Sequence, residues 1–323
     1  MVNLGLWFDL RGAPGGTGPT ARRYGFTLEM AEEADRLGAH SVWVSEHHLF
    51  DDGYLPQPLV FAAAIAARTT RVRVGTAVTI APIRPAALLA EEAAVVDLLS
   101  DGRLELGVGA GYRAPEFGLY GAPLSGRILR TDVIVAEVRR LWQTGGITPR
   151  PANPDPAIWL GYQGPKGARR AGLLGESLLS ADPAQATPYL EGLRDGGHDV
   201  SRARMAGALN LWVSEDPERD WPVVREYLAA QWNSYLRHAA EGTGQPPPRP
   251  ISPDRWRERG LGPRPGSFLI ATPQDAAAEL KRYLDGTPVE TVFVWATLGG
   301  MPDELVAAHA RLLTTRLAPL LAA

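Results

Sequence analysis

Short strand patterns alternate with helical patterns along this chain of 323 residues, and this order limits the possible folds more than any other feature. Apolar residues at three- and four-residue spacing, typical of helices, separate most of the strand patterns. A repeated strand–helix order with short connections favours parallel strands, and eight such units close into a (β/α)8 barrel. We therefore predict a single TIM-barrel domain over residues 1–323 rather than an open sheet. The expected strands cover residues 3–8, a segment beginning at Ser41, 71–79, 104–108, 157–161, 176–179, 208–213 and 289–295.

The composition narrows the classes of function. The formal net charge is −3, and no run of Lys or Arg forms the basic stripe that a nucleic-acid partner requires. The absence of cysteine excludes disulfides, thiolate metal ligands and a cysteine nucleophile. No apolar run is long enough to span a membrane, and the N-terminus shows no signal-peptide pattern. We expect a cytoplasmic protein that binds neither nucleic acid nor membranes.

One segment interrupts the regular alternation. Residues 214–268 separate the seventh expected strand from the eighth, and they contain a proline-rich tract at 245–250 and a charged run around Trp256. A connection this long in a barrel is usually functional or disordered. Because the segment leaves the C-terminal end of a strand, we expect it to fold over the barrel mouth as a lid. A disordered surface insertion is the alternative.

An acidic residue and two histidines follow the second strand directly. Glu46, His47 and His48 come immediately after the strand pattern that begins at Ser41. Ligands of parallel α/β proteins bind at the C-terminal ends of the strands, so we expect His47 and Glu46 to be catalytic. Adjacent residues of a strand point to opposite faces, so His48 is expected to point away, and no zinc ligand set is complete. In the structural alternative, one histidine caps the strand and the other faces solvent.

Two glycine-containing turns are candidates for binding a flat, phosphorylated ligand. Gly109 lies at the end of the fourth strand, where a residue without Cβ lets the backbone approach a ligand closely. The glycine spacing there differs from the dinucleotide fingerprint, and no acidic residue ends the next strand. Residues 161–167 connect the fifth strand to a helix, where backbone N–H groups and the helix dipole converge on an anion. An ordinary strand-to-helix turn is the alternative for this segment.

Four motifs carry a resemblance to a known family: Trp43-Val-Ser-Glu-His-His48, Gly75-Thr-Ala-Val, residues 85–103 ending in Leu-Leu-Ser-Asp-Gly-Arg, and the segment from Gly107 to Glu116-Phe. Together they resemble the bacterial luciferase-like superfamily of flavin-dependent oxidoreductases. Looser matches at residues 158–175, 271–273 and 300–302 extend the resemblance over nearly the whole chain. The combination is specific for the superfamily and not for a substrate.

The resemblance implies a barrel whose mouth binds reduced FMN or the deazaflavin coenzyme F420. It places His47 beside the reactive edge of the isoalloxazine ring. It also implies that Ala77 and Val78 bulge under the ring, often through a non-proline cis peptide. Gly109 stands where the luciferases carry a reactive cysteine, so that feature is absent here. The residues that match or adjoin the phosphate side are Gln163, Gly164, Lys166, Gly167 and Ala168.

The motifs resemble families that use different cofactors. Glu-His-His resembles the FMN monooxygenases, whereas Gln163-Gly-Pro-Lys resembles the F420-dependent branch. We favour a monooxygenase that uses reduced FMN and O2 on a small organic substrate. A reductase or dehydrogenase that transfers hydride from reduced F420 is the alternative, and a non-catalytic flavin-binding partner protein is the second alternative. Retention of His47 argues against the latter.

The expected partners are small molecules and proteins. A separate NAD(P)H-dependent flavin or F420 reductase is expected to supply the reduced cofactor, and we expect the chain to form a homodimer. Four residues at or just beyond strand ends are expected to contact the substrate, although each fits equally well as a packed rim residue: Tyr54, Tyr112, Arg113 and Trp295.

Overall fold

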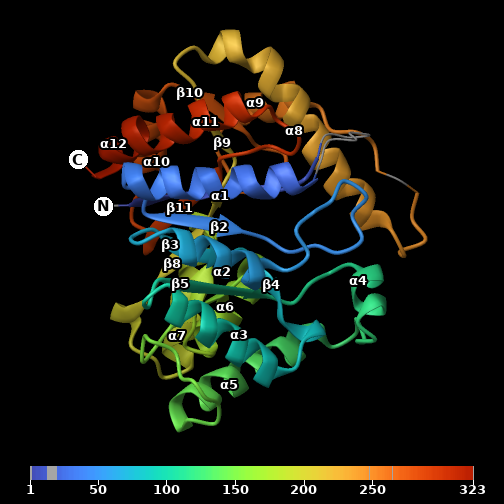
Figure 1. Cartoon of the computed structure of the whole chain (residues 1–323), viewed down its shortest axis with the longest axis vertical. Helices are drawn as coiled ribbons and strands as arrows, with labels where there is room; N and C mark the ends of the chain where they lie inside the picture. The colour runs from blue at the N-terminus through green and yellow to red at the C-terminus, as the bar shows by residue number, and fades with distance from the viewer. Residues whose placement is uncertain (1, 13–19, 247, 264, 323) are drawn as a thin grey trace.

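The computed structural model describes residues 2–12, 20–246, 248–263 and 265–322. Within them, eight parallel strands close into a barrel, which confirms the predicted (β/α)8 fold (Figure 1). The strands neighbour one another in the order β3, β2, β1, β11, β8, β7, β6, β5, and pairing of β3 with β5 closes the ring. Their bounds are β1 Asn3–Trp7, β2 Ser41–Val44, β3 Arg73–Thr76, β5 Leu104–Gly109, β6 Ala157–Leu160, β7 Ser177–Leu179, β8 Met205–Leu209 and β11 Val289–Trp295.

Helices surround the strands and bury their apolar faces against them (Figure 1). Local sequence explains several of the boundaries. Proline stands in the first turn of α2, α6 and α10, where its missing N–H has no helical partner to lose. Gly145 ends α5 in the left-handed conformation, with φ of 69°. The helices are α1 Thr20–Leu37, α2 Pro58–Arg68, α3 Ala86–Leu99, α4 Ala114–Leu119, α5 Arg127–Thr144, α6 Gly164–Leu173, α7 Ala186–Asp195, α8 Pro217–Ala240, α9 Pro253–Glu258, α10 Pro273–Leu284, α11 Asp303–Leu312 and α12 Ala318–Ala322.

The sequence predicted a continuous third strand over residues 71–79, but the structure shows an interruption in this segment. Strand β3 ends at Thr76, and β4 resumes the pairing with β5 at Thr79–Ile80. The peptide bond between Ala77 and Val78 is cis although neither residue is proline. The cis peptide that the family resemblance implied is therefore present, and it interrupts the strand at the barrel mouth.

The prediction of one continuous seventh strand over residues 208–213 is also wrong. At Asn210 the chain leaves the barrel sheet and begins to pair with a different strand. Strand β8 belongs to the barrel, whereas β9 Leu211–Val213 pairs with β10 Leu269–Ala271 in a separate two-stranded sheet. The backbone N–H of Asn210 donates to the carbonyl of Gly262, and its carbonyl accepts from Leu269 N–H. Strand β9 therefore leads directly into the segment 214–268, in which helices α8 and α9 lie.

Large aromatic side chains fill part of the barrel interior. Trp43, Trp159 and Phe293 are almost fully buried there, and the rings of Trp43 and Phe293 stack with centroids 4.5 Å apart. Glycine makes this packing possible, since a Cβ at Gly75 would lie 2.3 Å from the Trp43 ring. Space for a cavity lies toward the C-terminal ends of the strands.

The outer surface carries a group of exposed apolar side chains on the neighbouring helices α2 and α3: Val60, Leu88, Val95 and Leu99. Exposed apolar groups of this kind often mark a protein–protein contact. The expected homodimer stays a prediction. No helix in the described part of the chain combines the length and the apolar character needed to cross a membrane.

Candidate active site

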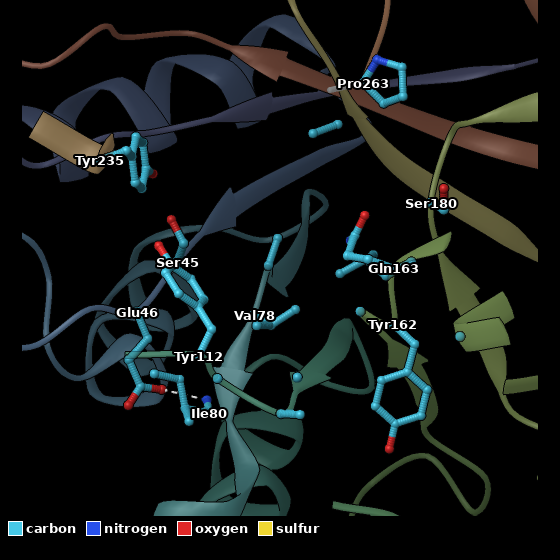
Figure 2. A pocket seen from close by; sticks show the side chains of 18 of the residues that line it. Ser45, Glu46, Val78, Ile80, Tyr112, Tyr162, Gln163, Ser180, Tyr235 and Pro263 are labelled. Atoms are coloured by element: carbon cyan, nitrogen blue, oxygen red, sulfur yellow. Dashed lines mark hydrogen bonds between the residues drawn. The ribbon is translucent and has the colours of Figure 1, made fainter. Parts of the chain in front are cut away.

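A cavity of about 830 Å³ lies at the C-terminal ends of the barrel strands. Loops after the strands form its walls, and Tyr235 and Pro263 of the segment 214–268 lie at its edge (Figure 2). Trp232 of the same segment also lines the cavity. Most of the predicted site residues line it: Glu46, His47, Tyr54, Ala77, Val78, Gly109, Tyr112, Gln163, Lys166, Gly167 and Trp295. Three others, Arg113, Gly164 and Ala168, are not among the lining residues. Their individual roles remain predictions.

His47 is held by a buried carboxylate that we did not predict as a site residue. The imidazole Nδ1 lies 2.7 Å from Oε1 of Glu116, which belongs to helix α4. An ionised carboxylate only accepts hydrogen bonds, so this contact places the proton of a neutral His47 ring on Nδ1. The Nε2 atom is then left to accept a hydrogen bond, and the His47 side chain lines the cavity. This arrangement suits proton transfer to or from a bound ligand.

Glu116 is kept ionised by its neighbours. Burial raises the pKa of Glu116, but hydrogen bonds from His47 and the His48 backbone, together with the charge of Arg113, outweigh it and hold this pKa below its usual range. Its Oε1 accepts from His48 N at 3.0 Å and from Arg113 Nη1 at 3.0 Å as well as from His47. The sequence signal for this residue was its place in the last family motif, three residues after Arg113.

Glu46 lines the cavity, but its carboxylate is already engaged on both oxygens. Oε1 lies 2.7 Å from His48 Nε2 and 2.8 Å from Arg84 Nη1. Oε2 accepts from the backbone N–H of Ile80 at 2.8 Å (Figure 2). Ile80 follows the cis peptide by two residues, so Glu46 fixes the backbone of that wall. The geometry favours a positioning role over the catalytic role that we predicted.

His48 points away from the cavity, as expected, but for a different reason. Strand β2 ends at Val44, so neither histidine lies on a strand and strand alternation does not apply. The His48 ring is buried between Glu46 and Tyr120, whose ring centroid is 4.9 Å away. In the described residues, no group of His, Asp and Glu side chains has the arrangement of a metal site.

Arg113 does not take the position that we predicted for a substrate contact. It is 1% exposed, and its guanidinium contacts backbone carbonyls and two carboxylates instead of the cavity. Arg113 does follow the end of a strand, as we predicted. Helix α4 begins at the next residue, however, and the Arg113 side chain points into the protein.

The turn between β6 and α6 has the features of an anion site. Gln163 is the N-cap residue of α6, and the first N–H groups of a helix lack intrahelical partners. Lys166 is exposed and has no carboxylate partner among the residues that the structure describes. Arg170 also lines the cavity but is paired with Asp132. The positive helix end and Lys166 together favour a phosphate group at this end of the cavity.

Gly164 and Ala168 shape this turn without lining the cavity. Gly164 has φ of 72°, the left-handed region that glycine adopts without strain. Ala168 is fully buried on the inner face of α6. These two predicted cofactor residues therefore position the turn rather than face the cavity.

A chain of hydroxyl groups forms the wall opposite this turn. Hydrogen bonds join Ser45 Oγ to Tyr54 OH at 2.6 Å and Tyr54 OH to Tyr235 OH at 2.7 Å. Burial raises the pKa of both tyrosines, so the phenols stay neutral. The guanidinium of buried Arg11 lies 4.1 Å from the Tyr235 ring centroid. Ser45 and Tyr235 were not predicted as substrate contacts, because only the fold brings them to Tyr54.

Several known proteins are similar to this chain in sequence and in fold. An uncharacterized protein of Sinorhizobium fredii, y4wF, is 32% identical over 179 residues, which cover 51% of this chain and 52% of that protein. The chain thus spans about half of the length of this relative. An F420-dependent glucose-6-phosphate dehydrogenase of Amycolatopsis mediterranei is 31% identical over 82% of this chain and 87% of its own length.

Other similar proteins are monooxygenases by name. Limonene 1,2-monooxygenase of Rhodococcus erythropolis is 27% identical over 79% of this chain and 70% of its own length. The crystal structure of monooxygenase RslO1 from Streptomyces bottropensis superposes with a TM-score of 0.76 and 24% identity, covering 98% of this chain and 99% of that one. The family model for luciferase-like monooxygenases matches residues 4–289. The chain therefore belongs to the luciferase-like monooxygenase family.

Proposed function

We propose that this chain is an oxidoreductase that binds a reduced flavin-type cofactor in the barrel cavity and uses His47 for proton transfer. One observation supports this above all. The Glu116-held imidazole of His47, the cis peptide at Ala77–Val78 and the cationic helix end at Lys166 all belong to one cavity. A planar ring lying on the cis peptide, with its phosphate at α6, would bring its reactive edge toward His47.

The cavity wall beneath such a ring fits a flat group. A Cβ at Gly109 would lie 2.5 Å from Val78 Cγ2, and a Cβ at Gly161 would lie 2.6 Å from Val78 Cγ1. Any larger residue at these two positions would push Val78 into the cavity. The two glycines therefore keep the cavity surface around the cis peptide flat, and a stacked tricyclic ring needs a flat surface.

The protein and the cofactor have separate tasks in this proposal. When bound, a reduced flavin supplies either the activation of O2 or a hydride. The chain holds the phosphate at α6, supports the ring on Ala77 and Val78, and presents His47 Nε2 to exchange a proton. The aromatic groups Tyr112, Trp232 and Tyr235 exclude water around the reacting atoms. The hydroxyls of Tyr54 and Tyr235 can hold a polar group of the substrate.

Reduced FMN with O2 remains our first proposal for the cofactor, and reduced F420 is the alternative. The Glu-His-His motif supports the former. The 31% identity to an F420-dependent dehydrogenase supports the latter. A relative from Acinetobacter baylyi is the oxygenase component of a trigonelline monooxygenase, which supports the proposal of a separate reductase that supplies the reduced cofactor.

Anaerobic titration with FMN and F420, each oxidised and reduced, tests the proposal. We expect tight binding of reduced FMN, and Lys166→Ala should weaken binding of whichever cofactor binds by about five- to tenfold, or ~1 kcal/mol, because a charge-assisted contact is lost. The effect stays at this lower end because Lys166 is exposed and screened. Lys281→Ala, which removes the other lysine of the chain on helix α10, is the matched control.

Three outcomes of this titration are informative. Tight binding of F420 alone would move the assignment to hydride transfer from the deazaflavin. Binding of neither cofactor would contradict the proposed function and favour a non-catalytic protein. Equal effects of Lys166→Ala and Lys281→Ala would remove Lys166 from the phosphate site.

We also propose that the segment 214–268 acts as a lid. Trp232 and Tyr235 line the cavity, whereas Trp221 and Trp256 pack inside the segment itself. The Trp221 indole donates to Asp254 Oδ1 at 2.8 Å, which joins α8 to α9. The segment thus has its own small core and presents one aromatic face to the cavity.

Limited subtilisin digestion tests the lid. Cleavage in residues 241–246 should be fast in the free protein and several-fold slower when cofactor and substrate are bound, because lid closure protects the chain after α8. Cleavage elsewhere in the chain serves as the internal reference. Equal rates in the free and the bound protein, with activity retained after cleavage, would show that the segment is a passive insertion.

A further inference from the structure

Arg113 joins three segments that are far apart in the sequence. Its Nη1 donates to the carbonyl of His48 at 2.6 Å and to Glu116 Oε1 at 3.0 Å. Its Nε donates to the carbonyl of His238 at 2.9 Å, and its Nη2 contacts Glu241 Oε2 at 2.6 Å. Since His238 and Glu241 lie at the C-terminal end of α8, one buried side chain connects the proposed lid to the loop after β2 and to α4.

The carboxylate of Glu116 depends on donors at a single oxygen. Oε1 accepts from His47 Nδ1, His48 N and Arg113 Nη1, whereas Oε2 is buried and has no hydrogen-bond partner in the described part of the chain. Nothing bonded to Oε2 therefore resists rotation of the carboxylate about its last side-chain bond. Its orientation, and with it the direction of the His47 hydrogen bond, is fixed by the three donors on Oε1.

The end of α8 docks on the same loop through further contacts. Arg237 Nη1 pairs with Asp51 Oδ2 at 2.7 Å, and Ser234 donates to Asp52. The His238 ring stacks on Phe50 with centroids 3.9 Å apart, while the Arg113 guanidinium lies 4.5 Å from the Phe50 ring centroid. Figure 1 shows this part of α8 extending beside the loop that follows β2.

We propose that Arg113 is a positioning residue that couples docking of the C-terminal end of α8 to the orientation of Glu116 and His47. With α8 docked, the His238 carbonyl and Glu241 hold the guanidinium in place, so that it supports Glu116. When this end of α8 moves away, Arg113 loses two of its acceptors and the Glu116–His47 hydrogen bond loses its support. The inference deepens the proposed role of His47, because it makes that role depend on a closed lid.

Glu241→Gln and Arg113→Lys test the coupling, with Glu218→Gln as the matched control. Glu218 pairs with Arg257 at the opposite end of α8, so the control removes an ion pair from the same helix without touching Arg113. The readout is the imidazole tautomer of His47, measured from long-range ¹H–¹⁵N correlations in alkaline buffer. His47→Gln assigns the resonance, and no cofactor is needed.

In the wild type and in Glu218→Gln, His47 should be a single tautomer with the proton on Nδ1. In Glu241→Gln the ¹⁵N chemical shifts of the His47 ring should move toward the average of the two tautomers. They should move further in Arg113→Lys, because a lysine side chain cannot reach all four acceptors of Arg113. Glu241 is partly exposed, so its variant is expected to stay folded even if Arg113→Lys does not.

An unchanged His47 tautomer in folded Glu241→Gln would overturn the proposal and leave Arg113 as an anchor of the insertion only. This outcome is distinguishable from failure of the proposed function. If the tautomer shifts as expected but neither flavin nor F420 binds, the coupling stands and the cofactor assignment fails.

Discussion

Replacing His47 by alanine should lower turnover about 10²-fold or more, the usual scale for the loss of a proton-transfer group, while the protein stays folded. The imidazole has its Nδ1 bound to Glu116 and lines the cavity where we place the reactive edge of the ring. Because the proposed cofactor contacts lie on Ala77, Val78 and the α6 turn, affinity for the reduced cofactor should change little. A loss in kcat without a change in cofactor Kd is therefore expected.

His198→Ala is the matched control for this variant, since His198 is exposed and does not line the cavity. Turnover is measured with the reduced cofactor that the titration identifies, and cofactor affinity is measured separately by anaerobic fluorescence titration. If His47→Ala retained wild-type turnover, the histidine would be only a structural part of the cavity wall. If it lost cofactor binding instead, His47 would belong to the binding surface.

The barrel was predictable from local patterns, because the strand and helix periods are written into consecutive residues. The same patterns failed where the chain leaves the regular geometry. The cis peptide after Ala77 breaks the third strand, and the change of partners at Asn210 divides the seventh into β8 and β9. Alternating apolar residues continue through both points, so the pattern does not show the interruption. Only the family resemblance indicated the first of them.

The candidate site was predictable as a set of positions but less so as a set of roles. Strand ends located His47, Gly109 and Gln163 at one mouth, because parallel strands share a direction. The partners of those residues come from distant segments, as Glu116 does for His47. A pairing of this kind depends on tertiary contacts between α4 and the loop after β2, which no local period encodes. The prediction that Arg113 contacts the substrate failed for the same reason, because its contacts are with distant segments of the chain.

Glu46→Gln should lower the free energy of unfolding by about 3–5 kcal/mol, the usual loss when one partner of a buried ion pair is neutralised. Glu46 and Arg84 are 2% and 8% exposed, and their side chains lie 2.8 Å apart. The variant leaves the buried Arg84 guanidinium without a carboxylate at ion-pair distance among the described residues. Urea denaturation measures the change, and Glu137→Gln, which breaks an exposed pair with Arg140, is the control expected to show no measurable effect.

The same variant distinguishes the two roles of Glu46. If Glu46 positions the wall that contains Ile80, cofactor affinity should fall together with stability, because the backbone after the cis peptide loses its ionic support. The double variant with Arg84→Gln should lose less stability than the sum of the single variants, since it removes the uncompensated charge. If Glu46→Gln kept its stability and cofactor affinity but lost turnover, Glu46 would be a catalytic acid or base. The catalytic role predicted from the sequence would then replace the positioning role that the hydrogen bonds favour.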